Sequence, residues 1–356
     1  MILIISPESW GKLYVSKHHY ALCLAERNQV YFLNPPGNLI KITETVKNLK
    51  VIDYKPMFKG IRFLPSALQA YLTKQQILRL EKRVQAKFDV VWNFDSSRFF
   101  NLKSLINKFR IAHIVDLNQN IMRGTLASTS DLCLGVTNGI CEQLKKFNPN
   151  THLINHGYHI SRSKTLNKVK LPGRNNIKAL LLGNLSRFSI DWKILNQVVK
   201  NSPNVDFVFI GPAGKSNLGP NEMSSQNYLS KTEGNNVHFT GAVNSEEIHQ
   251  WLEQADILLI SFKEDFHEQQ TNSHKLMQYF GAGKVVVATY TADFKDRPEL
   301  ILMSENNSAF PELFNQVLNK IDYHNSKEYI TARKNFALDN TYQKQIERIA
   351  KLIDTL

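Results

Sequence analysis

Long hydrophobic runs and cysteines are both scarce in this chain of 356 residues. No run approaches the roughly 20 apolar residues that a membrane-spanning helix needs, and the longest, such as Ile257–Ile260, have the length of a strand. The cysteines Cys23, Cys133 and Cys141 are odd in number and far apart, which argues against a disulfide framework and favours a reducing compartment. The chain opens on MILIIS without a basic leader, so we expect no secretory signal and a cytoplasmic location.

Acidic residues are also few, with 31 Asp and Glu against 44 Lys and Arg. Between Tyr54 and Phe88 the single acid Glu81 is accompanied by eight basic residues: Lys55, Lys59, Arg62, Lys74, Arg79, Lys82, Arg83 and Lys87. Large apolar residues alternate with these charges, which fits an anionic membrane surface better than nucleic acid, since no nucleic-acid module is recognisable. A solvated basic helix that packs its apolar stripe on its own domain is the alternative, and the stripe would be Ile77, Leu80, Val84 and Phe88.

Apolar strand-like segments alternate with helical ones along most of the chain, which is typical of parallel sheets covered by helices on both faces. A helix is expected near 98–108. The polar segment 161–176 breaks the alternation, and we interpret it as a linker. We therefore predict an α/β fold with two Rossmann-like domains, 1–160 and 177–335, and a helix at 336–356 that is a candidate for packing back on the first domain. The expected strands are 2–5, 30–33, 89–94, 111–117, 132–136, 152–155, 177–182, 205–210, 237–240, 257–260 and 285–289.

One stretch, residues 272–289 with the sequence NSHKLMQYFGAGKVVVAT, combines the features of an anion site. Its polar helix start offers free backbone N–H groups, which bind anions. Lys275 in the first turn adds a charge that can reach a diphosphate. Gln278 follows one turn later, where its amide can hydrogen-bond a sugar hydroxyl. On this pattern alone, a plain capped helix leading into a core strand is the alternative.

This stretch resembles the donor-binding segment of GT-B-type glycosyltransferases (glycosyl transferases group 1, family 4-like, of the bacterial polysaccharide biosynthesis type). That segment commonly reads N-P-x-K-x-x-E-Y-x-A-x-G-K-P-V-V. Further pieces resemble the family in the same order along the chain, namely 131–138 with 153–157, then 181–187, 205–212 and 236–243. The resemblance implies two Rossmann-like domains facing across a cleft, with the nucleotide-sugar donor held by the C-terminal domain.

The resemblance implies a donor site at three glycine-containing loops. Gly183, Asn184 and Arg187 would lie beside the donor diphosphate, because glycine permits close approach of the backbone and arginine supplies a fork of phosphate donors. Gly211 and Gly241 would border the nucleotide base. These residues form the first half of the expected donor site.

The second half of that site would come from the motif at 272–289. Phosphate and sugar would be held by its first residues, Asn272, Ser273, His274 and Lys275. Gln278 stands where the family usually has a glutamate that grips the ribose, and the family's first acidic residue falls at Gln270. The two-glutamate signature is therefore Gln and Gln here, a departure that leaves the stereochemistry of transfer, retaining or inverting, open.

Two residues of the N-terminal half are candidate catalytic groups. Family members often place a histidine near the start of the first helix, facing the cleft, and the resemblance implies that His19 takes this place. Packing or a surface role is the alternative for His19. Asp116 follows an expected strand at the edge where parallel sheets place ligand groups, so it is a candidate general base for an acceptor hydroxyl. A loop-capping aspartate is the alternative there.

The histidines His156, His159, His267 and His274 lack a Cys/His/Asp set at a recognised ligand spacing, so we expect no metal and no cofactor beyond the donor. The resemblance implies sugar transfer from a nucleoside-diphosphate sugar to a glycan or lipid-linked acceptor in cell-surface polysaccharide synthesis. The segment 54–88 would then dock on the anionic inner face of the cell membrane. Two alternatives stay open: a sugar-nucleotide epimerase of the same architecture, and a non-catalytic basic membrane- or nucleotide-binding protein.

Overall fold

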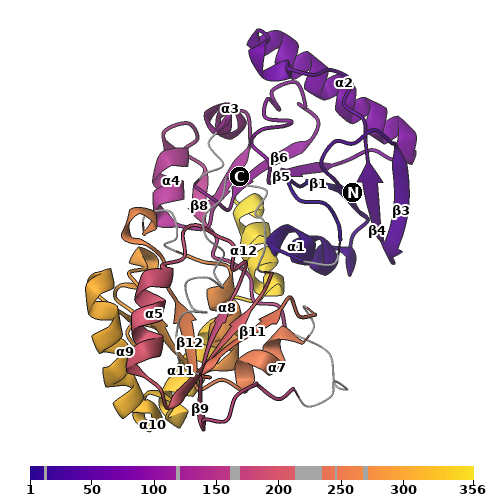
Figure 1. The fold of residues 1–356 in the computed structure, drawn as a ribbon. Coiled ribbons are helices and arrows are strands. Elements are labelled where there is room, and N and C mark those ends of the chain that lie inside the picture. The colour runs from indigo at the N-terminus through magenta and orange to yellow at the C-terminus, as the bar shows by residue number, and fades with distance from the viewer. Residues whose placement is uncertain (12–13, 118–120, 161–168, 213–234, 245–246, 268–271) are drawn as a thin grey trace. The chain divides into compact units, whose positions relative to one another are not determined.

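The computed structural model describes residues 1–11, 14–117, 121–160, 169–212, 235–244, 247–267 and 272–356. The chain divides into two compact units. Unit 1 comprises Met1–Gly157 together with Tyr342–Leu356, and unit 2 comprises Tyr158–Thr341. Each unit is built on one mainly parallel sheet covered by helices (Figure 1). Within the residues described, no helix is both long and apolar enough to cross a membrane.

The sheet of unit 1 has the order β3-β4-β2-β1-β5-β6-β7-β8, and all its pairings are parallel except the β3–β4 edge hairpin. Its strands are β1 (Ile2–Ile5), β2 (Val30–Leu33), β3 (Lys41–Val46), β4 (Leu49–Asp53), β5 (Val90–Asn93), β6 (Phe109–Ile114), β7 (Leu132–Gly135) and β8 (Thr151–Leu153). Its helices are α1 (Ser16–Ala25), η1 (Ile61–Phe63), α2 (Ser66–Val84), α3 (Arg123–Ser128), α4 (Asn138–Lys145) and α12 (Tyr342–Asp354).

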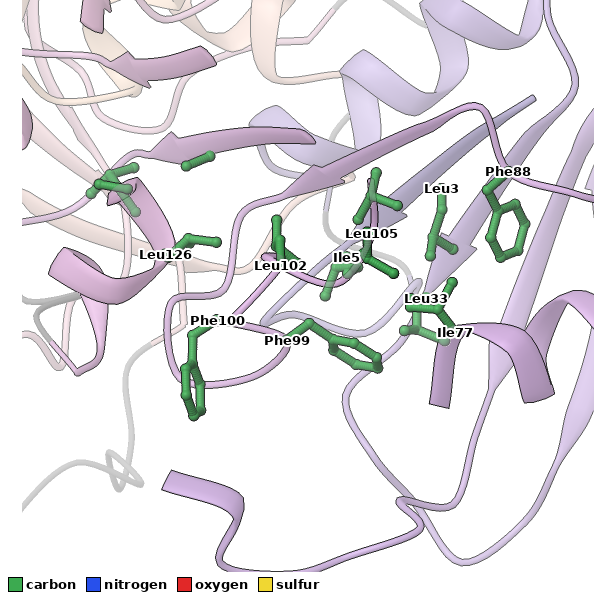
Figure 2. Packing of buried hydrophobic residues seen from close by; sticks show 14 of the residues in the cluster. Leu3, Ile5, Leu33, Ile77, Phe88, Phe99, Phe100, Leu102, Leu105 and Leu126 are labelled. Carbon is green, nitrogen blue, oxygen red and sulfur yellow. The ribbon is translucent and has the colours of Figure 1, made fainter. Parts of the chain in front are cut away.

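Both faces of this sheet are covered, which explains why its central strands are almost entirely apolar. On one face α2 contributes Ile77 to a core that includes Leu33 and Phe99 (Figure 2). On the other face α1 and α12 lie side by side (Figure 1), and Tyr342 of α12 packs against Tyr20 of α1 with ring centroids 5.0 Å apart. The end of the chain is therefore part of the core of unit 1.

The sheet of unit 2 has the order β11-β10-β9-β12-β13-β14 and is parallel throughout. Its strands are β9 (Ile177–Leu182), β10 (Val205–Ile210), β11 (Val237–Gly241), β12 (Ile257–Ile260), β13 (Val285–Ala288) and β14 (Leu302–Met303). The helices α5 and α9 cover one face, and α7, α8 and α11 cover the other. Its helices are α5 (Trp192–Asn201), α7 (Ile248–Glu253), η2 (Glu264–Phe266), α8 (Lys275–Ala282), η3 (Ala292–Phe294), η4 (Asn307–Ala309), α9 (Phe310–Asn319), α10 (Ile321–His324) and α11 (Lys327–Asp339).

The unit boundaries differ from the expected ones. The first falls after Gly157 rather than after residue 160, and the second falls after Thr341 rather than after residue 335. The second differs because α11 packs on α8, and its buried Arg333 donates to the carbonyl of Gly283 at 3.2 Å. The expected helix at 336–356 is thus the end of α11 followed by the separate helix α12. Residues 161–168 of the expected linker lie outside the described residues.

The expectation of a helix near 98–108 is wrong, because these residues form turns. Phe99 adopts the left-handed conformation, with φ of 49°, which a regular helix does not contain. The buried amide of Asn93 donates to the carbonyls of Arg98 and Phe99 at 3.0 and 3.1 Å, so a side chain satisfies groups that a helix would have satisfied itself.

Candidate functional sites

Three glycines mark the carboxyl ends of neighbouring strands in unit 2. Gly183 follows β9, Gly211 follows β10 and Gly241 ends β11, with φ of 149°, 140° and 72°. Residues with a side chain rarely adopt these backbone conformations, so each turn favours glycine. In a parallel sheet, this edge is where ligands bind.

The turns after β9 and β10 approach each other too closely for any side chain. A Cβ atom on Gly211 would lie 1.7 Å from the carbonyl oxygen of Gly183. The N–H of Gly183 donates to Ile210 and the N–H of Gly211 donates to Gly241, both at 2.9 Å, so the three loops are joined through their backbones. The result is an edge formed by backbone atoms, which a ligand can approach closely.

Lys275, the first residue of α8, reaches this edge from the other side of β9. Its ammonium donates to the carbonyl of Leu182 at 3.0 Å and lies 5.3 Å from the ring centre of Phe262. A Cβ atom on Gly183 would be 3.5 Å from the Lys275 Nζ. The structure therefore brings the predicted residues Gly183, Gly211 and Lys275 together.

The charge of Lys275 is poorly compensated in this position. Burial disfavours the ammonium and the positive charge of Arg187 adds repulsion, and together they lower its pKa from 10.5 to about 7. Arg187 itself is exposed in the loop after β9. Two cations beside glycine turns form a site that favours an anion with several oxygens, such as a diphosphate.

The remaining residues predicted to bind the donor lie close in sequence to Gly183 and to Lys275. Asn184 is exposed and its side-chain oxygen accepts from the N–H of Ser186 at 3.0 Å, which shapes the loop that carries Arg187. The half-buried Asn272, Ser273 and His274 lead into the first turn of α8, and the half-buried Gln278 follows Lys275 by three residues. Gln270 lies outside the described residues.

Two supporting residues were missed by the sequence analysis. The hydroxyl of Tyr279 accepts from the N–H of Leu182 at 2.9 Å and donates to the carbonyl of Leu259 at 3.2 Å, so it ties β9 to β12 below the site. Asn307 donates to the carbonyl of Phe262 at 2.9 Å and holds the ring beneath Lys275. The spacing of Tyr279, four residues after Lys275 on one helix face, was the available signal. Nothing local marks Asn307.

The two candidate catalytic residues belong to unit 1. His19 is buried in the first turn of α1 and stacks on Tyr342, with ring centroids 4.9 Å apart. This contact gives His19 a packing role. Asp116 is half-buried just past the carboxyl end of β6, the edge at which parallel sheets bind ligands. Within the described part of the chain, no three His, Cys, Asp or Glu side chains gather as metal ligands do.

The basic segment 54–88 of unit 1 contains two kinds of apolar residue. Ile77 and Leu80 point from α2 into the core and are buried, as the packing alternative for this stripe expects. A different set is exposed at the surface, among the basic residues: Met57, Phe58, Phe63, Leu68, Tyr71 and Leu78. Phe63, at 78% exposure, is among the most exposed large apolar residues described in the chain. The segment therefore has both a buried apolar face and an exposed apolar and cationic face.

Known proteins resemble the chain in both sequence and structure. The family described as Glycosyl transferases group 1 matches residues 179–320. The teichuronic acid biosynthesis glycosyltransferase TuaH of Bacillus subtilis (strain 168), so named, is 27% identical over 119 residues, which are 33% of this chain. The match spans only 28% of the length of TuaH.

Solved structures resemble the whole chain. Sucrose-phosphate synthase from Thermosynechococcus elongatus has a TM-score of 0.71 at 13% identity, over 99% of this chain and 98% of that one. WaaG, a glycosyltransferase involved in lipopolysaccharide biosynthesis, has a TM-score of 0.65 at 11% identity, over 99% of both chains. Anabaena HepE in complex with UDP has a TM-score of 0.66 at 13% identity, over 100% of both chains. At these identities the likeness to solved structures shows the fold, which is the GT-B fold, and the family model adds that residues 179–320 are similar to glycosyl transferases group 1.

Proposed function

We propose that the chain is a glycosyltransferase that takes a sugar from a nucleoside-diphosphate sugar held by unit 2. The observation that carries the proposal is the position of Lys275, whose buried ammonium lies at the glycine turn after β9, next to the turn after β10, within the segment that the family model matches. Arg187 would take the diphosphate with Lys275, and Gln278 the ribose. The structure of Anabaena HepE contains UDP, which makes UDP the first nucleotide to test.

Calorimetric titration with UDP tests the donor site. Lys275→Met and Arg187→Ala should each weaken binding by ~1–3 kcal/mol, because each removes a charged hydrogen bond. Gln278→Leu should also weaken binding, whereas Gln278→Glu should preserve it. Lys193→Ala, an exposed lysine on α5 of the same unit, is the matched control. Wild-type affinity in both the Lys275 and Arg187 variants would contradict the proposed site.

The type of activity needs a second measurement. A transferase releases free nucleotide only when an acceptor is present, an epimerase releases it without one or returns an altered sugar, and a binding protein releases none. We propose transfer without a metal, because Lys275 and Arg187 neutralise the diphosphate themselves. Activity should then persist in EDTA, and a full loss that Mg²⁺ or Mn²⁺ restores would contradict this part of the proposal.

We propose further that the acceptor is a glycan or a lipid-linked glycan of cell-surface polysaccharide synthesis. The names of two similar proteins, TuaH and WaaG, support this proposal, since they refer to teichuronic acid and lipopolysaccharide biosynthesis. A lipid-linked acceptor has to be met at a membrane. The exposed apolar and cationic face of 54–88 would then dock on the anionic inner leaflet from the cytoplasm.

A further inference from the structure

Unit 1 contains a cavity of about 530 Å³ beside the basic segment. It lies at the carboxyl ends of β2, β4 and β5, represented in its lining by Pro36, Tyr54 and Ser97. Leu72 and two other side chains of α2 close it on another side, and the segment 56–63 forms its rim. This is the edge at which a parallel sheet binds ligands, and the volume is in the range of small-molecule sites.

The loop after β5 that forms one wall is held in a strained conformation. Phe99 has φ of 49°, which a bulky side chain adopts only where its surroundings impose it. Asn93 fixes the loop from below through the carbonyls of Arg98 and Phe99. The ring of Phe99 lies beside Ile77 and Leu33 in the core (Figure 2) and also lines the cavity. This wall of the cavity is therefore fixed by hydrogen bonds to its backbone and by core packing, and does not depend on the positions of surface side chains.

The lining is apolar with cations at defined places. Among the lining residues, Lys59, Arg62 and Arg98 are basic and none is acidic. Arg98 forms an ion pair with Asp95, which orients it, and Arg62 stacks over the ring of Phe63, 4.7 Å from its centre. The apolar lining residues are Met57, Phe58, Ile61, Phe63, Leu72, Phe99 and Ile121. An apolar chain with an anionic head complements such a lining.

We propose that this cavity binds the phosphate and the adjoining apolar chain of the lipid-linked acceptor, an inference that rests on the proposed function. Arg62 and Lys59 at the rim hold the phosphate, and the chain lies against Phe99 and Leu72. The exposed Phe58 and Phe63 continue from the rim to the surface of the segment, where the rest of the chain remains in the bilayer. The lipid thereby passes from the membrane into the protein along one continuous apolar path.

Calorimetry with farnesyl phosphate, below its critical micelle concentration, tests the cavity in the full chain. Leu72→Trp fills the cavity and should raise Kd by at least about tenfold, whereas Leu78→Trp, an exposed leucine on the same helix outside the lining, should not. Arg62→Glu should weaken binding similarly, with Arg79→Glu on α2 as its matched control. Farnesol should bind at least about tenfold more weakly, and inorganic phosphate should not bind measurably.

Wild-type affinity in Leu72→Trp would overturn the proposal, and so would farnesol binding as tightly as farnesyl phosphate. Dihexanoyl phosphatidic acid tests whether the cavity binds an ordinary bilayer lipid instead. If it binds as tightly as farnesyl phosphate, the proposal is also overturned. Hydrogen exchange in the strands of unit 1 shows that the variants are folded, and UDP titration of the same variants separates the two proposals. UDP binding without farnesyl phosphate binding refutes the cavity alone, and the reverse result refutes the donor site in unit 2.

Discussion

Lys275 shows how the surroundings of one side chain set the chemistry of the proposed donor site. Its ammonium contacts a backbone carbonyl and an aromatic ring, and its pKa of about 7 results from burial and from Arg187. A bound diphosphate would bring negative charge next to the ammonium and raise that pKa. Binding above pH 7 therefore has to include the uptake of a proton.

We expect the affinity for UDP to fall by up to about tenfold per pH unit above the pKa of Lys275, because charging the ammonium then costs free energy. Below that pKa the free protein already carries the charge, so affinity should level off. Calorimetry in two buffers of different ionisation enthalpy measures the proton uptake. Lys275→Met should abolish the uptake and Lys193→Met should keep it. The same uptake in Lys275→Met and wild type would mean that another group titrates.

His113 of β6 is a second residue whose protonation is linked to stability. It is fully buried beside the rings of Trp92 and Phe94, and neither of its ring nitrogens has a hydrogen-bond partner among the residues described. Burial and the charge of Lys17 lower its pKa from 6.5 to about 3. Between these values the unfolded chain binds a proton here and the folded chain does not, so the folded state loses stability as the pH falls.

The expected loss is roughly 1.4 kcal/mol per pH unit below the unfolded pKa, until the pH nears the folded value. Urea unfolding at about pH 6 and about pH 4, read by the fluorescence of the tryptophans, measures it. His113→Phe keeps an aromatic ring but cannot bind a proton, so its free energy of unfolding should change less over this range. Equal slopes in the variant and the wild type would refute the role of His113.

At the scale of elements, α2 has a buried apolar face and an exposed face with both apolar and basic residues. Its buried face, with Ile77 and Leu80, belongs to the core of unit 1, and its outer face presents Tyr71 and Leu78 among basic residues. Exposed apolar residues stabilise membrane binding only together with the charges, because each term alone is weak. The element is therefore suited to reversible binding at an anionic surface.

Vesicle flotation tests this face of α2. Lys82→Glu with Arg83→Glu should release the protein from anionic vesicles, because each basic residue near the surface contributes about 1 kcal/mol and its reversal adds repulsion. Phe63→Ser should also reduce recovery. Lys193→Glu with Lys200→Glu makes the same change in charge on α5 of unit 2 and should have no effect. Equal recovery with neutral and anionic vesicles would show that the basic face is only solvated.

The sequence predicted the parallel strands well because their apolar runs, such as those at 177–182 and 257–260, are buried on both faces. It missed three strands: β3, whose residues are mostly exposed on an edge hairpin, its partner β4, and the two-residue strand β14. It also placed a helix at 98–108, where the turn depends on Asn93 and on the conformation of Phe99. Such a turn is determined by contacts between residues apart in sequence, which periodicity does not reveal.

At the scale of the whole molecule, part of the candidate site could be predicted from the local sequence and part depends on the folded sheet. Lys275 was predicted from its place at a helix start, and Gly183 and Gly211 from the resemblance to the family; the structure brings the three residues together. The surroundings that bury Lys275 come from β9, from Phe262 after β12 and from the loop of Arg187, and only the folded sheet brings these together. The cavity beside α2 likewise needs the ends of three strands that the chain order separates.

The chain leaves unit 1 at Gly157 and returns to it at Tyr342, so unit 1 is complete only when the last helix is in place. Tyr342 is 2% exposed and contacts Tyr20 and His19, and a Cβ atom on Gly157 would lie 2.3 Å from its ring. Such close packing leaves a cavity when the ring is removed. The stability of unit 1 therefore depends on a residue that lies beyond the whole of unit 2 in the sequence.

Tyr342→Ala should destabilise unit 1 by about 3–5 kcal/mol, the usual cost of removing a buried aromatic ring. Hydrogen exchange read by peptide should show lost protection in β1 and β5 of unit 1, while β9 and β12 of unit 2 keep theirs. Tyr323→Ala, which removes an exposed tyrosine of α10, is the control and should change neither group. UDP binding should survive Tyr342→Ala, because all residues of the proposed donor site belong to unit 2. Equal loss of protection in both units would mean that they unfold together and that α12 stabilises the entire chain.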